Sequence, residues 1–307
     1  TVWSYCLLII SLVIVWLLLR SKKISRAWLI GALIFLFVDL YVFAWRDIKR
    51  DFDTYHYVDE PSEAVQLLQA ELQQGKLIRL LGFRNPDELL PVIPSQNMLY
   101  GFHDLGAYSP FVLGRYHETI GLFGNVNDSN RAFPADVAFL KDHLALLKAL
   151  GVSHVLSTRP LKLNGFETLL EDQRLGVFLY RNKQSDGYSF FVSRFESFQN
   201  WEALKRRFLE PGFDPRNILL MEDSELYKFM PAISSKEAKT EFKPLEIRSG
   251  LERWIVESSE AGFFVLMNSH YPGWKATVNQ KKAPIVKAYG VFQAIYLPQA
   301  GRYEIEL

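Results

Sequence analysis

The chain has 307 residues, 49% of them hydrophobic and 14% aromatic, so it is longer than one average domain and can bury a sizeable core. Its formal net charge is +1, which gives no overall attraction to nucleic acid. Cys6 is its single cysteine, which excludes a disulfide or a cysteine metal site within the chain.

Two apolar runs open the chain. Residues 2–19 contain no charge, and residues 27–45 contain only Asp39. Each run approaches the roughly 20 residues that span a bilayer core of about 30 Å, so we predict two transmembrane helices within residues 1–46. A signal peptide is the alternative for the first run, although a second full-length run should not follow one. A carboxylate inside a span is costly, so Asp39 either serves helix packing or a substrate path, or is solvated near the outer end.

Charge predicts the orientation of these helices. The connector at 20–26 has four cations and no anion, whereas residues 46–53 mix three of each. The positive-inside rule then places the connector in the cytoplasm and the chain after about residue 46 on the extracytoplasmic side of a bacterial cell membrane. Because the sequence starts at Thr1 and is hydrophobic at once, we expect the C-terminal part of a larger multi-pass protein.

Helix and strand signals alternate between residues 47 and 240, which predicts an extracytoplasmic mixed α/β domain. A proline that starts a helix, apolar residues at helical spacing and glycines that end the segments indicate three helices. Short apolar runs indicate the strands between them. We expect helices at 61–72, 134–150 and 199–209, and strands at 77–83, 152–157, 175–180, 190–195 and 218–221.

Residues 241–307 have a different sequence pattern, which predicts short strands separated by turn residues such as Pro272-Gly273 and Asn279-Gln280. This rhythm is typical of a small antiparallel β-sandwich, in which we expect Trp254 and Trp274 to be largely buried. The predicted fold class is therefore α+β with two membrane helices. The expected strands are 251–257, 263–268, 274–279, 284–288, 291–297 and 303–307.

The stretch "YPGWKATVNQKKAPIVKAYGVFQAIYLPQAGRYEIEL" resembles the C-terminal signature of the bacterial membrane protein YfhO family. Three further stretches are similar to family segments in the same order: "YGFHDLGAYSPFVLGRYHE", "LALLKALGVSHVLS" and "LGVFLYRNKQSDGYSFFVSRFE". The chain departs from the family pattern at Asn279-Gln280, where Asp-Gly is usual, and at Tyr188-Ser189, where Pro-Arg is expected.

The resemblance implies a GT-C-type membrane glycosyltransferase in the lipid bilayer. Such a transferase takes sugar from a polyprenyl-phosphate carrier and adds it to a cell-envelope polymer, a teichoic acid in the studied members. The family's catalytic carboxylate lies in a first outer loop with no counterpart in this chain, so we assign no catalytic residue. The alternative is a non-catalytic envelope protein whose outer domains bind glycan or a protein partner.

Two groups of residues are candidates for binding. Asp51-Phe-Asp53 matches the Asp-x-Asp pattern that can hold a divalent cation, although carboxylates cluster at a membrane exit for other reasons too. A second group mixes aromatic rings and charges as a sugar-binding face does, and we expect it to face the membrane end near Trp45; packing on the domain is the alternative. This group is Tyr100, Asp104, Tyr108, Arg115 and Tyr116.

Overall fold

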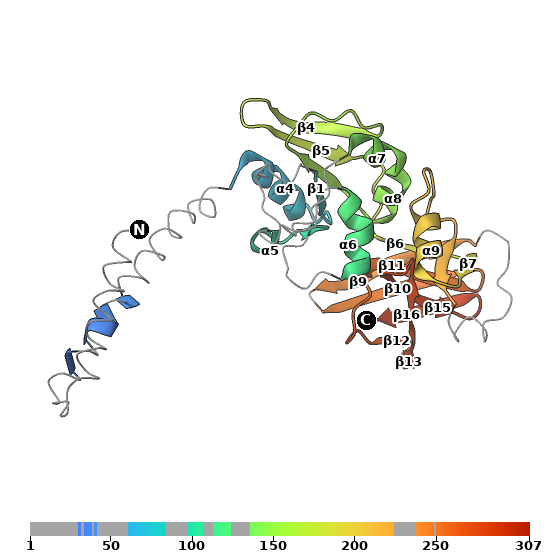
Figure 1. Ribbon diagram of the computed structural model, residues 1–307. Coiled ribbons are helices and arrows are strands. Elements are labelled where there is room, and N and C mark those ends of the chain that lie inside the picture. Colours follow the sequence, from blue (N-terminus) through green and yellow to red (C-terminus); the bar gives the residue numbers. More distant parts are fainter. Residues whose placement is uncertain are drawn as a thin grey trace. The chain divides into compact units, whose positions relative to one another are not determined.

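The computed structural model divides the chain into two compact units, Thr1–Ser62 and Glu63–Leu307, which we describe separately (Figure 1). Of the first unit it describes short helical pieces, in which most large apolar side chains are exposed, together with residues 61 and 62. The described residues are 30–31, 34–38, 40–41, 61–83, 97–106, 113–123, 136–223, 238–248 and 250–307.

The predicted fold class, α+β with two transmembrane helices, is wrong. In the part of the chain that the structure describes, strand predominates over helix, and no helix is both long and apolar enough to cross a bilayer. The longest helix there, α4 (Glu63–Gln73), has 11 residues and measures about 16 Å, against the roughly 30 Å of a hydrocarbon core. Of the two predicted spans, residues 2–19 lie outside the described residues, as do most of residues 27–45.

A five-stranded mixed sheet forms the first layer of the second unit. Its order is β2-β1-β3-β5-β4, with β1 parallel to β2 and β3, and β5 antiparallel to β3 and β4. The strand bounds are β1 (Arg79–Phe83), β2 (His103–Asp104), β3 (His154–Ser157), β4 (Phe166–Asp172) and β5 (Val177–Asn182).

The two faces of this sheet enter different cores, because side chains alternate along each strand. Leu80, Leu156 and Leu179 pack against α4 in a small core. Leu81 and Val155 face the opposite way, into a large core that continues through the rest of the unit. Around the sheet lie α5 (Asn97–Tyr100), α6 (Gly114–Ile120), the short 3-10 helix η1 (Gly121–Phe123), α7 (Val137–Asp142) and α8 (Leu144–Ala149).

Two further sheets pack face to face through their apolar sides, where the ring of Phe264 lies 5.5 Å from that of Trp254 and 5.7 Å from that of Phe242. One has the order β13-β12-β16-β10-β9 and the other β14-β15-β11-β6. The bounds are β6 (Ser189–Val192), β9 (Thr240–Arg248), β10 (Leu251–Ser258), β11 (Gly262–Ser269), β12 (Ala276–Val278), β13 (Lys281–Ala283), β14 (Ile285–Ala288), β15 (Phe292–Leu297) and β16 (Gly301–Glu306).

A strand from before residue 240 thus completes one of these sheets, since β6 pairs with β11. A two-stranded parallel sheet of β7 (Phe195–Phe198) and β8 (Leu219–Glu222) packs with α9 (Trp201–Phe208) beside it. The domain boundaries at about 46 and 240 stay predictions.

The expected strands and the helices at 61–72 and 199–209 are confirmed within a few residues. The helix expected at 134–150 is instead two helices, α7 and α8, which meet at His143. Trp254 is 4% exposed, as predicted, whereas Trp274 is only half-buried against the large core. The ring of Trp274 is less covered because it directly follows the exposed Pro272-Gly273 turn.

Candidate functional site

A pocket of about 550 Å³ lies between the five-stranded sheet and the face-to-face sheets. One wall is polar and comes from α4, β3, β5 and the segment before β1. The other wall is apolar and comes from β9, β10 and Tyr188. The volume lies in the range of about 300–1,000 Å³ that is usual for small-molecule sites. The main lining side chains are Glu71, Lys76, His154, Arg181, Tyr188, Phe242 and Trp254.

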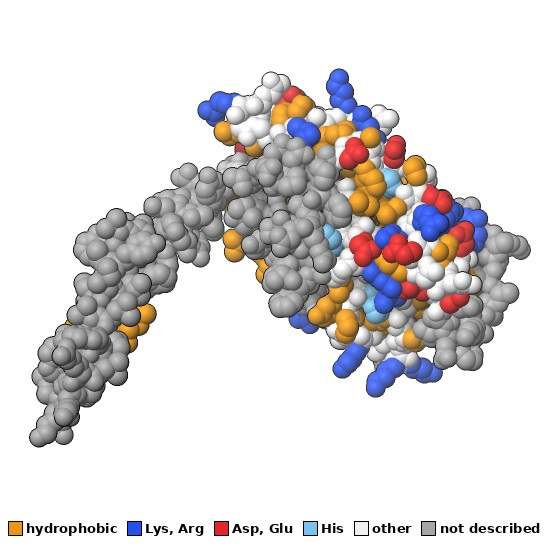
Figure 2. Space-filling model, in the orientation of Figure 1, with side chains coloured by type: hydrophobic (Ala, Val, Ile, Leu, Met, Phe, Trp, Pro, Cys, Tyr) orange, Lys and Arg blue, Asp and Glu red, His pale blue; other side chains and the backbone are white. Residues whose placement is uncertain are grey.

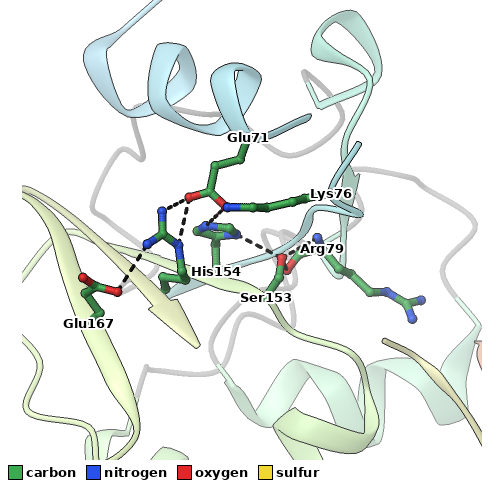
Figure 3. Close-up of polar contacts among 7 residues, drawn as sticks. Glu71, Lys76, Arg79, Ser153, His154 and Glu167 are labelled. Carbon is green, nitrogen blue, oxygen red and sulfur yellow. Dashed lines mark hydrogen bonds and ion pairs between the residues drawn. The ribbon is translucent and has the colours of Figure 1, made fainter. Parts of the chain in front are cut away.

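Glu71 is the centre of the polar wall. It reaches from α4 toward His154 and Lys76 (Figure 3). Its carboxylate accepts hydrogen bonds from Arg181 Nε at 2.8 Å, from Arg181 Nη2 and from Lys76 Nζ at 3.2 Å. The Nε2 atom of His154 lies 3.7 Å from Glu71 Oε2, and Arg181 Nη1 also donates to Glu167 at 3.2 Å. The carboxylate thus lies among three nitrogen-bearing side chains.

The protonation states of this cluster follow from its surroundings. Burial alone raises the pKa of Glu71, but hydrogen bonds from Arg181 and Lys76 outweigh it, and the pKa is lowered. Burial lowers the pKa of His154 to about 4, against the attraction of Glu71. At neutral pH the pocket therefore presents an ionised carboxylate, a neutral imidazole and two cations.

Three neighbouring side chains follow the order of a nucleophile, a base and an acid: Ser153, His154 and Glu71. Ser153 Oγ lies 3.0 Å from His154 Nδ1, yet it also accepts from the Arg79 N–H at 2.8 Å and donates to the Arg79 carbonyl at 3.2 Å. His154 is only 1% exposed. The Ser153 hydroxyl is held by the backbone groups of Arg79, and it fixes β1 against β3 beside the buried His154 ring. We therefore assign it no nucleophilic role.

A buried arginine joins the two walls of the pocket. The guanidinium of Arg79 points away from the cluster (Figure 3) and donates to the carbonyls of Leu150 at 3.0 Å and Met267 at 2.9 Å. It lies 4.7 Å from the centroid of the Tyr188 ring and 3.3 Å from Asn268 Oδ1. Arg79 thus connects β1, which pairs with β3 of the polar wall, to β11 and to Tyr188 of the apolar wall.

The residues that the sequence suggested as substrate-facing lie elsewhere, around α5, β2 and α6. The Tyr100 ring stacks on that of Phe102 with centroids 6.0 Å apart, and the Asp104 carboxylate accepts from the Gly106 N–H at 2.8 Å. Arg115 pairs with Glu222, and the Tyr116 hydroxyl donates to the Leu105 carbonyl at 2.8 Å. All four have partners within the unit, and contact with a substrate stays a prediction.

The other sequence candidates fall outside the described residues: Asp39, Asp51, Asp53, Tyr108 and Trp45. Among the residues that the structure does describe, no group of three or more His, Cys, Asp or Glu side chains could hold a metal ion. A divalent cation at the Asp-x-Asp motif stays a hypothesis.

The sequence prediction did not include Glu71, His154 or Arg181, and only Glu71 carries a local signal. Glu71 lies on the apolar stripe of α4 with Ala64 and Leu68, where a charged residue requires a buried partner. His154 and Arg181 are direct partners across the antiparallel pair β3–β5. Only the strand pairing shows that these positions meet.

Comparison with protein-family models, with curated proteins and with solved structures finds no match to this chain.

Proposed function

We propose that this chain binds a glycan in the pocket between the two walls. We further propose that it is the acceptor-binding part of a glycosyltransferase that takes sugar from a polyprenyl-phosphate carrier and adds it to a cell-envelope polymer. The observation that carries the proposal is the pairing of a hydrogen-bonding, ionised wall with an apolar aromatic wall. The donor and the envelope acceptor come from the family resemblance of the C-terminal hairpin.

The charges of the polar wall favour a ligand without net charge. Arg181 and Lys183 both pair with Glu167, and Asp186 pairs with Arg216. Each charge of the wall therefore has an opposite charge beside it, and the pocket attracts neither an anion nor a cation strongly. A sugar instead offers hydroxyls, which both accept from the cations and donate to the carboxylates.

The apolar wall supplies the second half of the recognition. Trp254 and Tyr188 line it from beneath, and half-buried Phe242 and Ile247 extend it toward solvent. The two C–H faces of a pyranose ring pack on such surfaces, while its hydroxyls at the ring edge reach hydrogen-bonding groups.

Lys76 offers the sharpest test, because its ammonium lines the pocket while its side chain is 49% exposed. We expect Lys76→Met to weaken binding of neutral hexose and N-acetylhexosamine disaccharides about tenfold, the effect of losing one charged hydrogen bond. Isothermal calorimetry with the 307-residue chain measures the affinity. Lys141→Met, on the exposed face of α7, is the matched control and should change nothing.

Equal affinities of the Lys76→Met and Lys141→Met variants would contradict a sugar in this pocket, as would the absence of binding to every disaccharide of the panel. Thermal unfolding of both variants checks that the fold is intact. A half-exposed ion pair contributes about 0–1 kcal/mol, so neither substitution should unfold the chain.

A second candidate function is glycan binding without transfer, and the protonation states favour it. A general base works best with a pKa near the working pH, whereas here the pKa of Glu71 is lowered and that of His154 is about 4. The lowered pKa values of Glu71 and His154 favour a pocket that holds a ligand over one in which these two groups transfer a proton. A transfer assay with a polyprenyl-phosphate sugar donor and the complete protein separates the two: product formation favours the transferase.

A further inference from the structure

Three Asp, Glu, Lys or Arg side chains are buried in the part of the chain that the structure describes: Glu71, Arg79 and Glu252. The other described charges are more exposed, and Figure 2 shows acidic and basic side chains interspersed on the face that it draws. Glu71 belongs to the polar wall of the pocket, and Arg79 joins the two walls. Glu252 is 6% exposed and does not line the pocket, so its burial requires a separate explanation.

Glu252 lies behind the apolar wall. It is two residues from Trp254 on β10, and side chains two apart on a strand share a face. Its carboxylate accepts a hydrogen bond from Trp254 Nε1 at 3.0 Å and another from Asn268 Nδ2. Burial, and then the charge of Glu252, raise the pKa of the Tyr188 hydroxyl. The two rings that line the apolar wall from beneath, Trp254 and Tyr188, therefore have their polar ends near one carboxylate.

The order of donors and acceptors requires an acid at this position. Arg79 Nη2 donates to Asn268 Oδ1 at 3.3 Å, and a guanidinium can only donate. The Asn268 amide must therefore present its nitrogen to Glu252, and the indole nitrogen of Trp254 is a donor as well. Two acceptor oxygens satisfy both donors. A glutamine would place its own amide nitrogen against one of them.

A network that ties the two face-to-face sheets together is the first explanation to weigh. Asn268 lies on β11 of one sheet and Glu252 on β10 of the other, so their bond does cross between the sheets. A buried charge network, however, often contributes little net stability compared with apolar residues of the same volume. The rings of Phe264 and Trp254, 5.5 Å apart, already join the same sheets. Cohesion of the sheets thus leaves the bond from Trp254 to Glu252 unexplained.

This bond controls which edge of the indole faces the pocket. The Trp254 ring packs against Phe264 and, at 6.1 Å, against Tyr188, but hydrophobic packing is not directional, whereas a hydrogen bond is. Because Glu252 lies outside the lining of the pocket, the N–H edge turns away from the pocket and Trp254 presents C–H groups to it. Without this acceptor, the buried N–H would be unsatisfied or would turn toward the pocket.

We propose that Glu252 is the positioning residue of the apolar wall and determines its selectivity among neutral sugars. This inference rests on the proposed glycan binding. Epimeric sugars carry one hydroxyl in either an axial or an equatorial position, so the C–H groups on their ring faces differ. A wall whose apolar edge is fixed in one orientation discriminates between such faces, because specificity is a difference of two affinities. Glu252 does not touch the ligand and acts through Trp254.

The first measurement requires no ligand. In the 307-residue chain, isotope-labelled at the indole nitrogens, NMR detects each tryptophan N–H, and Trp254→Phe identifies the resonance of Trp254. We expect Glu252→Gln to speed deuterium exchange of this N–H about tenfold, the effect of losing one charged hydrogen bond. Glu257→Gln, the same change at an exposed site of β10, is the matched control and should leave the exchange unchanged. Unchanged resonances of Trp201 and Trp274 show that each variant is folded.

The second measurement is calorimetry with cellobiose and lactose, which differ only in the axial or equatorial position of one hydroxyl. We expect their Kd values to differ about tenfold in the wild type and about twofold or less in Glu252→Gln. Glu257→Gln should keep the wild-type ratio. In the Trp254→Phe background, Glu252→Gln should change the ratio no further, because Glu252 acts through the indole N–H.

Three results would overturn the proposal: a wild-type Kd ratio near 1, an unchanged ratio in Glu252→Gln, or unchanged exchange of the Trp254 N–H in that variant. Absence of binding to both sugars is a different failure. If the Trp254 N–H still responds to Glu252→Gln, that result contradicts glycan binding, and the selectivity with it, but leaves the positioning of the indole by Glu252 intact.

Discussion

His154 determines how the pocket responds to acid. Its pKa is about 4 in the folded chain and near 6.5 when exposed, so the unfolded chain binds the proton first as pH falls. Stability is therefore complete above pH 6.5 and is lost as the pH falls toward 4. Glu71 acts in the same direction at lower pH, because its pKa is also lowered in the folded state.

We predict that His154 alone removes about 2 kcal/mol of unfolding free energy between pH 7 and pH 5. Urea unfolding at the two pH values measures this difference. In His154→Gln the loss should be smaller by about that amount, because glutamine does not titrate. The same loss in both proteins would mean that His154 is not buried in its neutral form.

At the scale of elements, the turn between β12 and β13 has the geometry of a two-residue hairpin loop. Asn279 and Gln280 have φ values of 48° and 64°, the combination that a type I′ turn requires. A glutamine at positive φ is strained, so we predict that Gln280→Gly stabilises the chain by about 0.5–1 kcal/mol.

Asn279→Gly is the control for this prediction. The Asn279 side chain accepts a hydrogen bond from the Glu304 N–H at 2.8 Å, which glycine would lose, so that variant should gain no stability. Chemical denaturation of the wild type and the two variants measures both effects. A destabilised Gln280→Gly variant would contradict the turn assignment.

Elements with local sequence signals could be predicted from the sequence, whereas elements that depend on contacts with distant residues could not. Most strands after residue 250 were predictable because turn residues and apolar alternation are both present in the sequence, but β13, with the sequence Lys-Lys-Ala, was not predicted. The break between α7 and α8 was not, since His143 reaches the distant Leu209 carbonyl at 3.0 Å as well as that of Phe139 at 2.7 Å. β9 was also not predicted, because its charged residues and Pro244 interrupt the apolar alternation expected of a strand. It nevertheless pairs with β10, with a register shift.

At the scale of the whole molecule, the pocket exists because distant segments are held together. Glu71, His154 and Arg181 come from one helix and two strands, and the opposite wall comes from strands after residue 240. Arg79 fixes this arrangement with its bonds to Leu150 and Met267, and Asn268 connects it to the buried Glu252. A sequence shows each residue but not these long-range pairings, so the aromatic segment around Tyr108 drew attention instead.

Hydrogen–deuterium exchange of the 307-residue chain, with and without a binding disaccharide, tests whether a neutral glycan occupies this pocket. We predict slower exchange at backbone amides of residues 76–78 and 181–189, which border the pocket, and unchanged exchange at the β12–β13 hairpin. Protection confined to residues 97–106 and 113–123, or no protection anywhere in the presence of saturating disaccharide, would exclude a glycan in this pocket.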